Sequence, residues 1–147
     1  MKYFITGILF LAIMQTSIAG ELMKHKIENF AVSTPEGFSI KKSSPVEDFN
    51  IYSIEKNGKT YVLIYLGNHP DFPRRARGDQ EATTKLNVGD VQVISIWRDK
   101  KLLKKEMLIK LATQGWPNYI HAWTTDGLVS SDMVIAENIL MSIDTQR

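Results

Sequence analysis

A β-hairpin near the middle of the chain constrains the fold more than any other feature of the sequence. Asn57-Gly58 separates two β-prone runs, residues 50–56 and 59–66. Asn-Gly in this setting is the strongest short-range signal for a two-residue hairpin turn. The second run is apolar at both odd and even positions from Tyr61 to Leu66. Because alternate side chains of a strand point to opposite faces, we expect this strand inside a sheet that is covered on both faces.

Other segments extend the same pattern. Further strands are predicted at residues 27–32, 91–97, 102–111 and 119–124. The period then changes: Met133, Ala136, Leu140 and Ile143 form one apolar stripe of a helix over residues 132–143, which Ser130 or Ser131 can cap. The sequence therefore predicts an α+β fold, a mostly antiparallel sheet of five to seven strands with the C-terminal helix packed on one face.

The first 19 residues have the organisation of a secretory signal peptide. A positive start at Lys2 precedes an apolar run over residues 3–14, and small residues follow up to Ala19. A membrane anchor is the alternative, but the run is shorter than the roughly 20 residues that a spanning helix needs. We predict cleavage near Ala19, a periplasmic location, and one soluble domain over residues 20–147 without stable membrane insertion.

Composition removes several classes of function. The chain has no cysteine, which excludes disulfides, a thiolate nucleophile and a lipidated N-terminal cysteine. The net charge of +2 argues against nucleic acid as a partner, because that binding depends on neutralising many phosphates. The glycine-rich, serine-hydrolase and metalloprotease motifs are absent. We therefore predict a protein that is not an enzyme and holds no cofactor.

Two short motifs suggest a family. The segments VSTPEGFSI (residues 32–40) and AENILMSID (residues 136–144) resemble the entry strands and the closing helix of a small α/β sandwich superfamily. That superfamily includes PsbP and the DcrB-like periplasmic proteins. The resemblance implies an extrinsic, non-catalytic partner protein in the lumen or the cell envelope, and it assigns no site residue.

The connection over residues 67–81 is the strongest candidate contact surface. It is longer than the usual four to six residues of a connection, and long ordered loops are disproportionately functional. Arginine and aromatic side chains, which it contains, are enriched at the energetic centres of interfaces. A flexible surface loop without a partner is the alternative. The candidate partner-binding residues are His69, Asp71, Phe72, Arg74, Arg75 and Arg77.

These features favour a non-enzymatic protein-binding module of the cell envelope, for example an inhibitor or a toxin-immunity protein. The alternative is an accessory domain that binds a small ligand or a metal ion near His69 and Asp71, with help from His121. For His121 itself we favour a structural role in an aromatic cluster with Tyr119 and Trp123. The lysine-rich segment 98–105 is predicted as an edge strand guarded by lysine, with contact to anionic lipid as the alternative. His25 is expected to be solvated.

Overall fold

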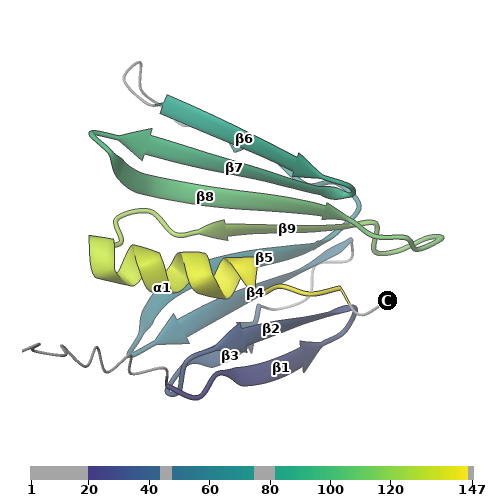
Figure 1. Ribbon diagram of the computed structural model, residues 1–147. Coiled ribbons are helices and arrows are strands. Elements are labelled where there is room, and N and C mark those ends of the chain that lie inside the picture. The colour runs from purple at the N-terminus through teal and green to yellow at the C-terminus, as the bar shows by residue number, and fades with distance from the viewer. Residues whose placement is uncertain (1–19, 44–47, 75–81, 146–147) are drawn as a thin grey trace, which may run out of the picture.

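The computed structural model describes residues 20–43, 48–74 and 82–145. The proposed export signal lies outside these ranges, as do Arg75 and Arg77 of the connection. Within them the predicted α+β class is confirmed. Seven strands form one antiparallel sheet, two strands form a separate hairpin, and the helix lies on one face of the sheet (Figure 1). No helix in the described part of the chain is long and apolar enough to cross a bilayer.

The large sheet contains the predicted hairpin. Its strands, in spatial order, are β3 (Ser39–Lys42), β4 (Phe49–Lys56), β5 (Lys59–Gly67), β9 (Tyr119–Thr124), β8 (Lys101–Lys110), β7 (Val91–Arg98) and β6 (Ala82–Val88). Asn57 and Gly58 turn β4 into β5 with φ values of 52° and 76°. As its two apolar faces predicted, β5 is an interior strand, paired with β4 and β9.

The prediction that the lysine-rich segment 98–105 forms a guarded edge is wrong. Most of this segment belongs to β8, which lies inside the sheet between β7 and β9. Its lysines tolerate that position because acidic side chains neutralise them: Lys104 pairs with Glu106, and Lys105 pairs with Glu137 of the helix. The edges of the described sheet are β3 and β6.

Helix α1 (Ser130–Met141) packs on the sheet through the predicted stripe. Met133, Ala136 and Leu140 are buried, and the helix contacts β5, β8 and β9. The helix begins earlier than predicted, at Ser130. Its N-cap is Val129, which offers no capping side chain. The predicted serine cap is therefore wrong, because a serine inside the first turn lies beyond the capping position.

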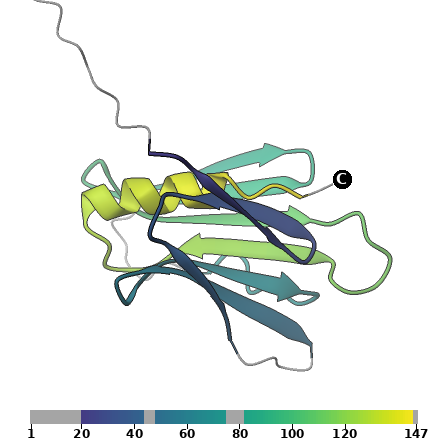
Figure 2. The ribbon, with the colours of Figure 1, turned by 90° about the horizontal axis from the view of Figure 1, so that it is seen from below.

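The N-terminal segment is a hairpin and not the single strand predicted for residues 27–32. Strands β1 (Met23–Ile27) and β2 (Phe30–Thr34) turn at Glu28, whose φ is 39°. The hairpin lies beside α1 on the same face of the sheet (Figure 2). Two backbone hydrogen bonds of 2.8 and 2.9 Å between Ala31 and Asp144 join it to the segment after the helix.

The unusual turn is held by the side chain of Glu28. Its carboxylate accepts hydrogen bonds from Tyr52, Asn50 and Lys42 on β4 and β3. These contacts offset the strain of a left-handed backbone at a residue with a Cβ. The expectation for His25 is also wrong, since its ring is partly buried and lies 2.9 Å from the Thr34 hydroxyl across the hairpin.

Candidate functional site

The described part of the long connection folds back onto the sheet face opposite the helix. We call residues 68–74 the strap. Because Ala122 lies on the helix side, alternation places His121 and Trp123 of β9 on the opposite face. The ring of Phe72 meets His121 edge-on with 5.4 Å between centroids, and the guanidinium of Arg74 lies 4.6 Å from the centroid of Trp123. The strap therefore covers the centre of this face.

A buried carboxylate lies beneath the strap. Glu106 and His121 are each only 1% exposed, and His121 Nε2 lies 3.2 Å from Glu106 Oε2. The backbone N–H of Arg74 donates to the same oxygen at 3.0 Å, and Lys104 Nζ is 3.0 Å from Oε1. Burial opposes the charge and raises the pKa of Glu106. The hydrogen bonds from His121 and Arg74 and the charge of Lys104 outweigh burial, so the pKa is lowered overall.

This cluster has the chemical groups of an acid–base pair but lacks access for a substrate. A carboxylate can orient an imidazole as a general base, yet here both groups are enclosed by Phe72 and Arg74. The arrangement instead fastens the strap to the sheet through Glu106. Of the aromatic cluster predicted around His121, the contact with Trp123 is confirmed, and the second ring against His121 is Phe72 of the strap, where Tyr119 was predicted.

The predicted partner-binding residues differ in how far their side chains are exposed and in the contacts that they already make. His69 and Asp71 are exposed. The His69 N–H donates to the Tyr65 hydroxyl at 2.9 Å, and the Asp71 carboxylate lies 3.9 Å from Arg74. Phe72 packs against the sheet, and Arg74 combines a half-exposed side chain with its contact to the ring of Trp123. The assignment of this group to a partner stays a prediction.

For the alternative function, binding of a metal ion, the part of the chain that the structure describes offers no cluster of ligands. No group of three His, Asp or Glu side chains gathers there in a way that could hold an ion. His121, the proposed third ligand, is paired with Glu106 beneath the strap. The exposed His69 and Asp71 therefore have no third described partner.

Sequence reasoning missed the open edge at β6. Strands β6 and β7 are joined by Gly89 and Asp90, with Val88 opposite Val91. The N–H of Lys110 on β8 donates to the carbonyl of Asp90 at 3.0 Å. Along an antiparallel strand, the backbone hydrogen bonds of successive residues point to opposite sides. Those of Asp90 are therefore directed toward β8, and those of Val91 toward β6.

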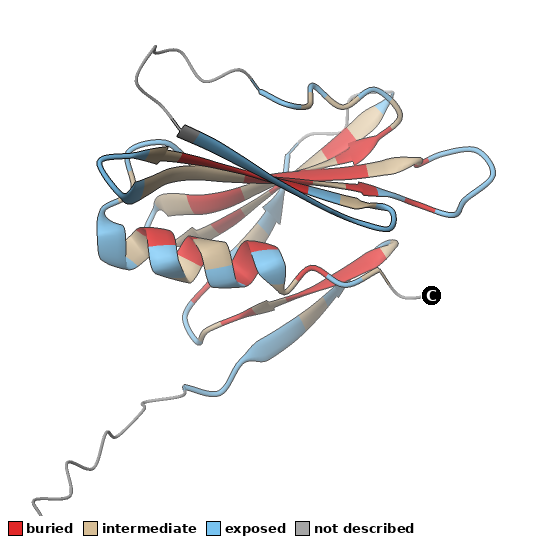
Figure 3. Cartoon of the chain, turned by 45° about the horizontal axis from the view of Figure 1, so that its top comes forward, coloured by how far each residue is buried: buried red, intermediate tan, exposed pale blue. Residues whose placement is uncertain are grey.

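The same alternation determines the direction in which the backbone N–H and C=O groups of β6 point. Thr84, Leu86 and Val88 bond to β7, whereas the N–H and C=O groups of Thr83, Lys85 and Asn87 point toward the edge, where no described strand pairs with them. Leu86 and Val88 are 57% and 64% exposed. Figure 3 draws the ribbon of β6 over residues 83–88 in the colour of exposed residues. Only the assembled sheet order could reveal which strand is left at the edge.

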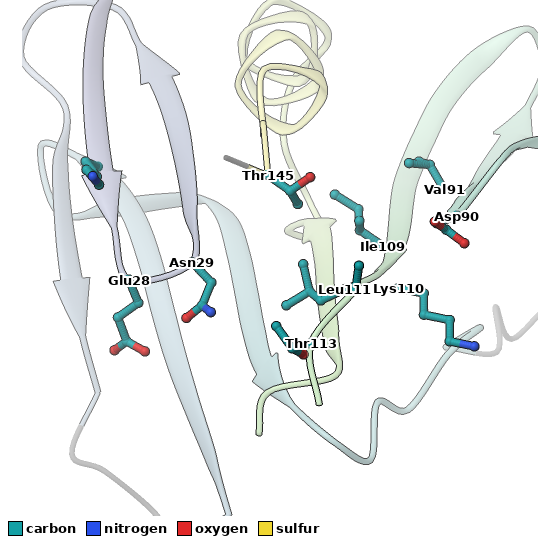
Figure 4. Close-up of a pocket in the computed structure, with 11 residues that line it drawn as sticks. Glu28, Asn29, Asp90, Val91, Ile109, Lys110, Leu111, Thr113 and Thr145 are labelled. Carbon is teal, nitrogen blue, oxygen red and sulfur yellow. The ribbon is translucent and has the colours of Figure 1, made fainter. Parts of the chain in front are cut away.

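A groove of about 580 Å³ opens at one end of the molecule, between the turn of the N-terminal hairpin and the end of the β7–β8 pair (Figure 4). Its apolar residues are Val91, Ile109, Leu111 and Ala112, and Thr145 lies on the C-terminal segment that borders it. The other lining residues are Lys26, Glu28, Asn29, Asp90, Lys110 and Thr113. The groove lies apart from the strap, so it forms a separate candidate site.

Comparison with known proteins adds no family. No protein-family model, no curated protein and no solved structure gives a significant match to this chain. The resemblance to PsbP and the DcrB-like proteins therefore stays a prediction.

Proposed function

We propose that this chain is a non-enzymatic protein-binding module of the cell envelope, and that it binds by adding an extended segment of its partner to β6. The open edge of β6 is the observation that carries the proposal. Thr83, Lys85 and Asn87 direct backbone groups to this edge, and exposed Leu86 and Val88 supply apolar contact beside it. Strand addition uses backbone hydrogen bonds for affinity and alternate side chains for specificity.

The arginine-bearing connection supports partner binding at the same edge. It leads directly into β6, so Arg75 and Arg77 precede Ala82 by only a few residues. Guanidinium groups form two-pronged hydrogen bonds with carboxylates. An extended partner segment that carries acidic residues next to its strand fits this combination. An inhibitor or toxin-immunity protein is one form of such a module, and it would be recognised by loss of the captured partner's activity.

Replacing Lys85 by proline is expected to weaken partner capture about tenfold or more. Proline removes the N–H that points to the open edge and obstructs the incoming strand, while the bonds of Thr84 and Leu86 to β7 remain. The free energy of unfolding should change by less than about 1 kcal/mol, because proline is tolerated on an edge strand. The measurement is quantitative pull-down from a periplasmic extract, with urea unfolding of the same preparations.

The matched control is Leu86→Pro, which removes a bond to β7 and should destabilise the domain itself. Changing Arg75 and Arg77 together to alanine tests the contribution of the connection. Full capture by Lys85→Pro would rule out strand addition at β6.

The groove supports a second candidate function, the binding of a small amphipathic anion. Its apolar residues suit a hydrocarbon body. Among the described residues, Lys26 and Lys110 have no ion-pair partner, whereas Glu28 is already paired with Lys42 and Asp90 is already engaged in an interaction. The two lysines are therefore the charged side chains that can meet an anionic group.

Octanoate is expected to raise the melting temperature of the protein by a few degrees when it is in large excess over its Kd, since it binds the folded state alone. The double variant Lys26→Glu/Lys110→Glu should lose this shift. The control is Lys100→Glu/Lys101→Glu, which makes the same charge change away from the groove and should keep the shift. Equal shifts in all three proteins would exclude the site.

A further inference from the structure

We propose that the open edge of β6 is occupied, in the purified protein, by β6 of a second copy, so that two sheets join across a two-fold axis. This inference rests on the proposed function, because it names the occupant of the same edge in the absence of another partner. Two observations support it: two copies of β6 can pair in a favourable register, and the described part of the fold leaves this edge uncovered.

Self-pairing of β6 has few possible registers. A two-fold axis perpendicular to a sheet places one residue opposite its own copy, and its neighbours pair symmetrically around it. An axis at Lys85 would place two ammonium groups opposite each other, which is unfavourable. An axis at Thr84 would pair residues 82–86 and leave the exposed apolar side chain of Val88 outside the pairing.

An axis at Leu86 pairs residues 84–88 of the two copies and leaves Ala82 and Thr83 outside the pairing. Leu86 then lies against its own copy, Lys85 lies opposite Asn87, and Thr84 lies opposite Val88. Each pair joins side chains that are compatible in charge and polarity. The exposed apolar side chains of Leu86 and Val88, which share one face, are covered by the second copy.

The backbone agrees with this register. Lys85 and Asn87 direct their N–H and C=O groups to the edge, so each Lys85 meets an Asn87 of the second copy as a hydrogen-bonded pair. Leu86 forms the non-hydrogen-bonded pair between them, where side chains approach most closely. An axis at an outward-bonding residue would also form a ladder, but only the axis at Leu86 combines the bonds with an apolar centre.

The other edge of the sheet, β3, is protected against pairing with another strand, whereas β6 is not. β3 has four residues and carries Lys41 and Lys42, which are features that discourage pairing. β6 has seven residues, one lysine and no proline. Within the described residues, α1 contacts β5, β8, β9 and β2, so it leaves the face at β6 uncovered. A closed two-fold pair removes this exposed edge without generating an open chain of copies.

The absence of cysteine makes the register directly testable, because Leu86→Cys introduces a unique thiol. Cα atoms of a non-hydrogen-bonded pair lie about 4.5 Å apart, within the range of a disulfide. We expect mild oxidation to convert this variant to a covalent dimer. The control is Val88→Cys, since Val88 is about equally exposed but lies roughly 13 Å from its copy in this register.

The assembly state is measured on the same proteins. By sedimentation equilibrium the wild-type protein should have twice the mass of the chain at micromolar concentration, and Lys85→Pro should be a monomer. Equal oxidation of Leu86→Cys and Val88→Cys overturns the proposed register. A dimer that survives Lys85→Pro overturns the proposed interface.

A monomeric wild-type protein overturns the inference as a whole. If that monomer still captures a partner, and Lys85→Pro abolishes the capture, the proposed function stands although the second copy is wrong. If the monomer captures a partner equally well with and without proline at position 85, both proposals fail.

Discussion

Replacing Glu106 by alanine should lower the free energy of unfolding by about 3–5 kcal/mol, the range for removing one partner of a buried charged network. The change leaves His121 and the N–H of Arg74 without their acceptor and Lys104 without its counter-charge. Because Arg74 belongs to the strap, the strap should also exchange its amide hydrogens faster. Urea unfolding and hydrogen exchange are the two measurements.

Glu55→Ala is the matched control. Glu55 lies on β4 and pairs with Lys41, whose side chain is exposed. Exposed pairs of this kind contribute little to stability, so this variant should unfold close to the wild type. Equal destabilisation of the two variants would contradict a special role for Glu106. Glu106→Gln should fall between them, because the amide keeps an acceptor but removes the charge.

The same site makes the stability dependent on pH in a defined direction. The pKa of Glu106 is lower in the folded protein than its ordinary value of 4.5. The unfolded chain therefore binds more protons in the acidic range, and the stability that Glu106 contributes is fully present above about pH 5. It is lost as the pH falls through the folded pKa. The difference between wild type and Glu106→Ala should narrow on acidification, and a constant difference would refute the assignment.

Leu140→Ala should cost about 2–5 kcal/mol of stability, since a fully buried leucine leaves a cavity when it is truncated. Leu140 is 0% exposed on the face of α1 that packs on the sheet. The matched control on the same helix is Val134→Ala, where the side chain is 56% exposed and the expected change is within about 0.5 kcal/mol. Thermal and urea unfolding report both. Similar values for the two variants would mean that α1 does not pack through this stripe.

The predicted features that the structure confirms depend on neighbours in the chain. Asn57 and Gly58 make a tight hairpin because both residues adopt a left-handed backbone at low cost. The stripe of α1 and the two apolar faces of β5 are read from the spacing of side chains along a helix or a strand. The serine cap and the single N-terminal strand were wrong because weak local preferences were overridden. Glu28 turns there only with the support of Tyr52 and Asn50.

The candidate site was less predictable than the fold. Residues 67–81 stood out by length and composition, yet the sequence could not show that Phe72 and Arg74 pack on their own sheet. That contact requires Glu106 and His121 to be neighbours, which follows from the pairing of β8 with β9. The lysines of β8 suggested an edge because the sequence does not show that Lys104 pairs with the buried Glu106 or that Lys105 pairs with Glu137 of the helix.

The sequence by itself determined the α+β class, the central hairpin and the buried face of the helix, because each depends on local periodicity and turn chemistry. Tertiary structure alone decided that β6 lies at the edge, that Glu106 is buried under the strap, and that the groove opens beside Glu28. The physical reason is that strand order and charge neutralisation arise between residues far apart in the chain. Their energies exist only after the strands have paired.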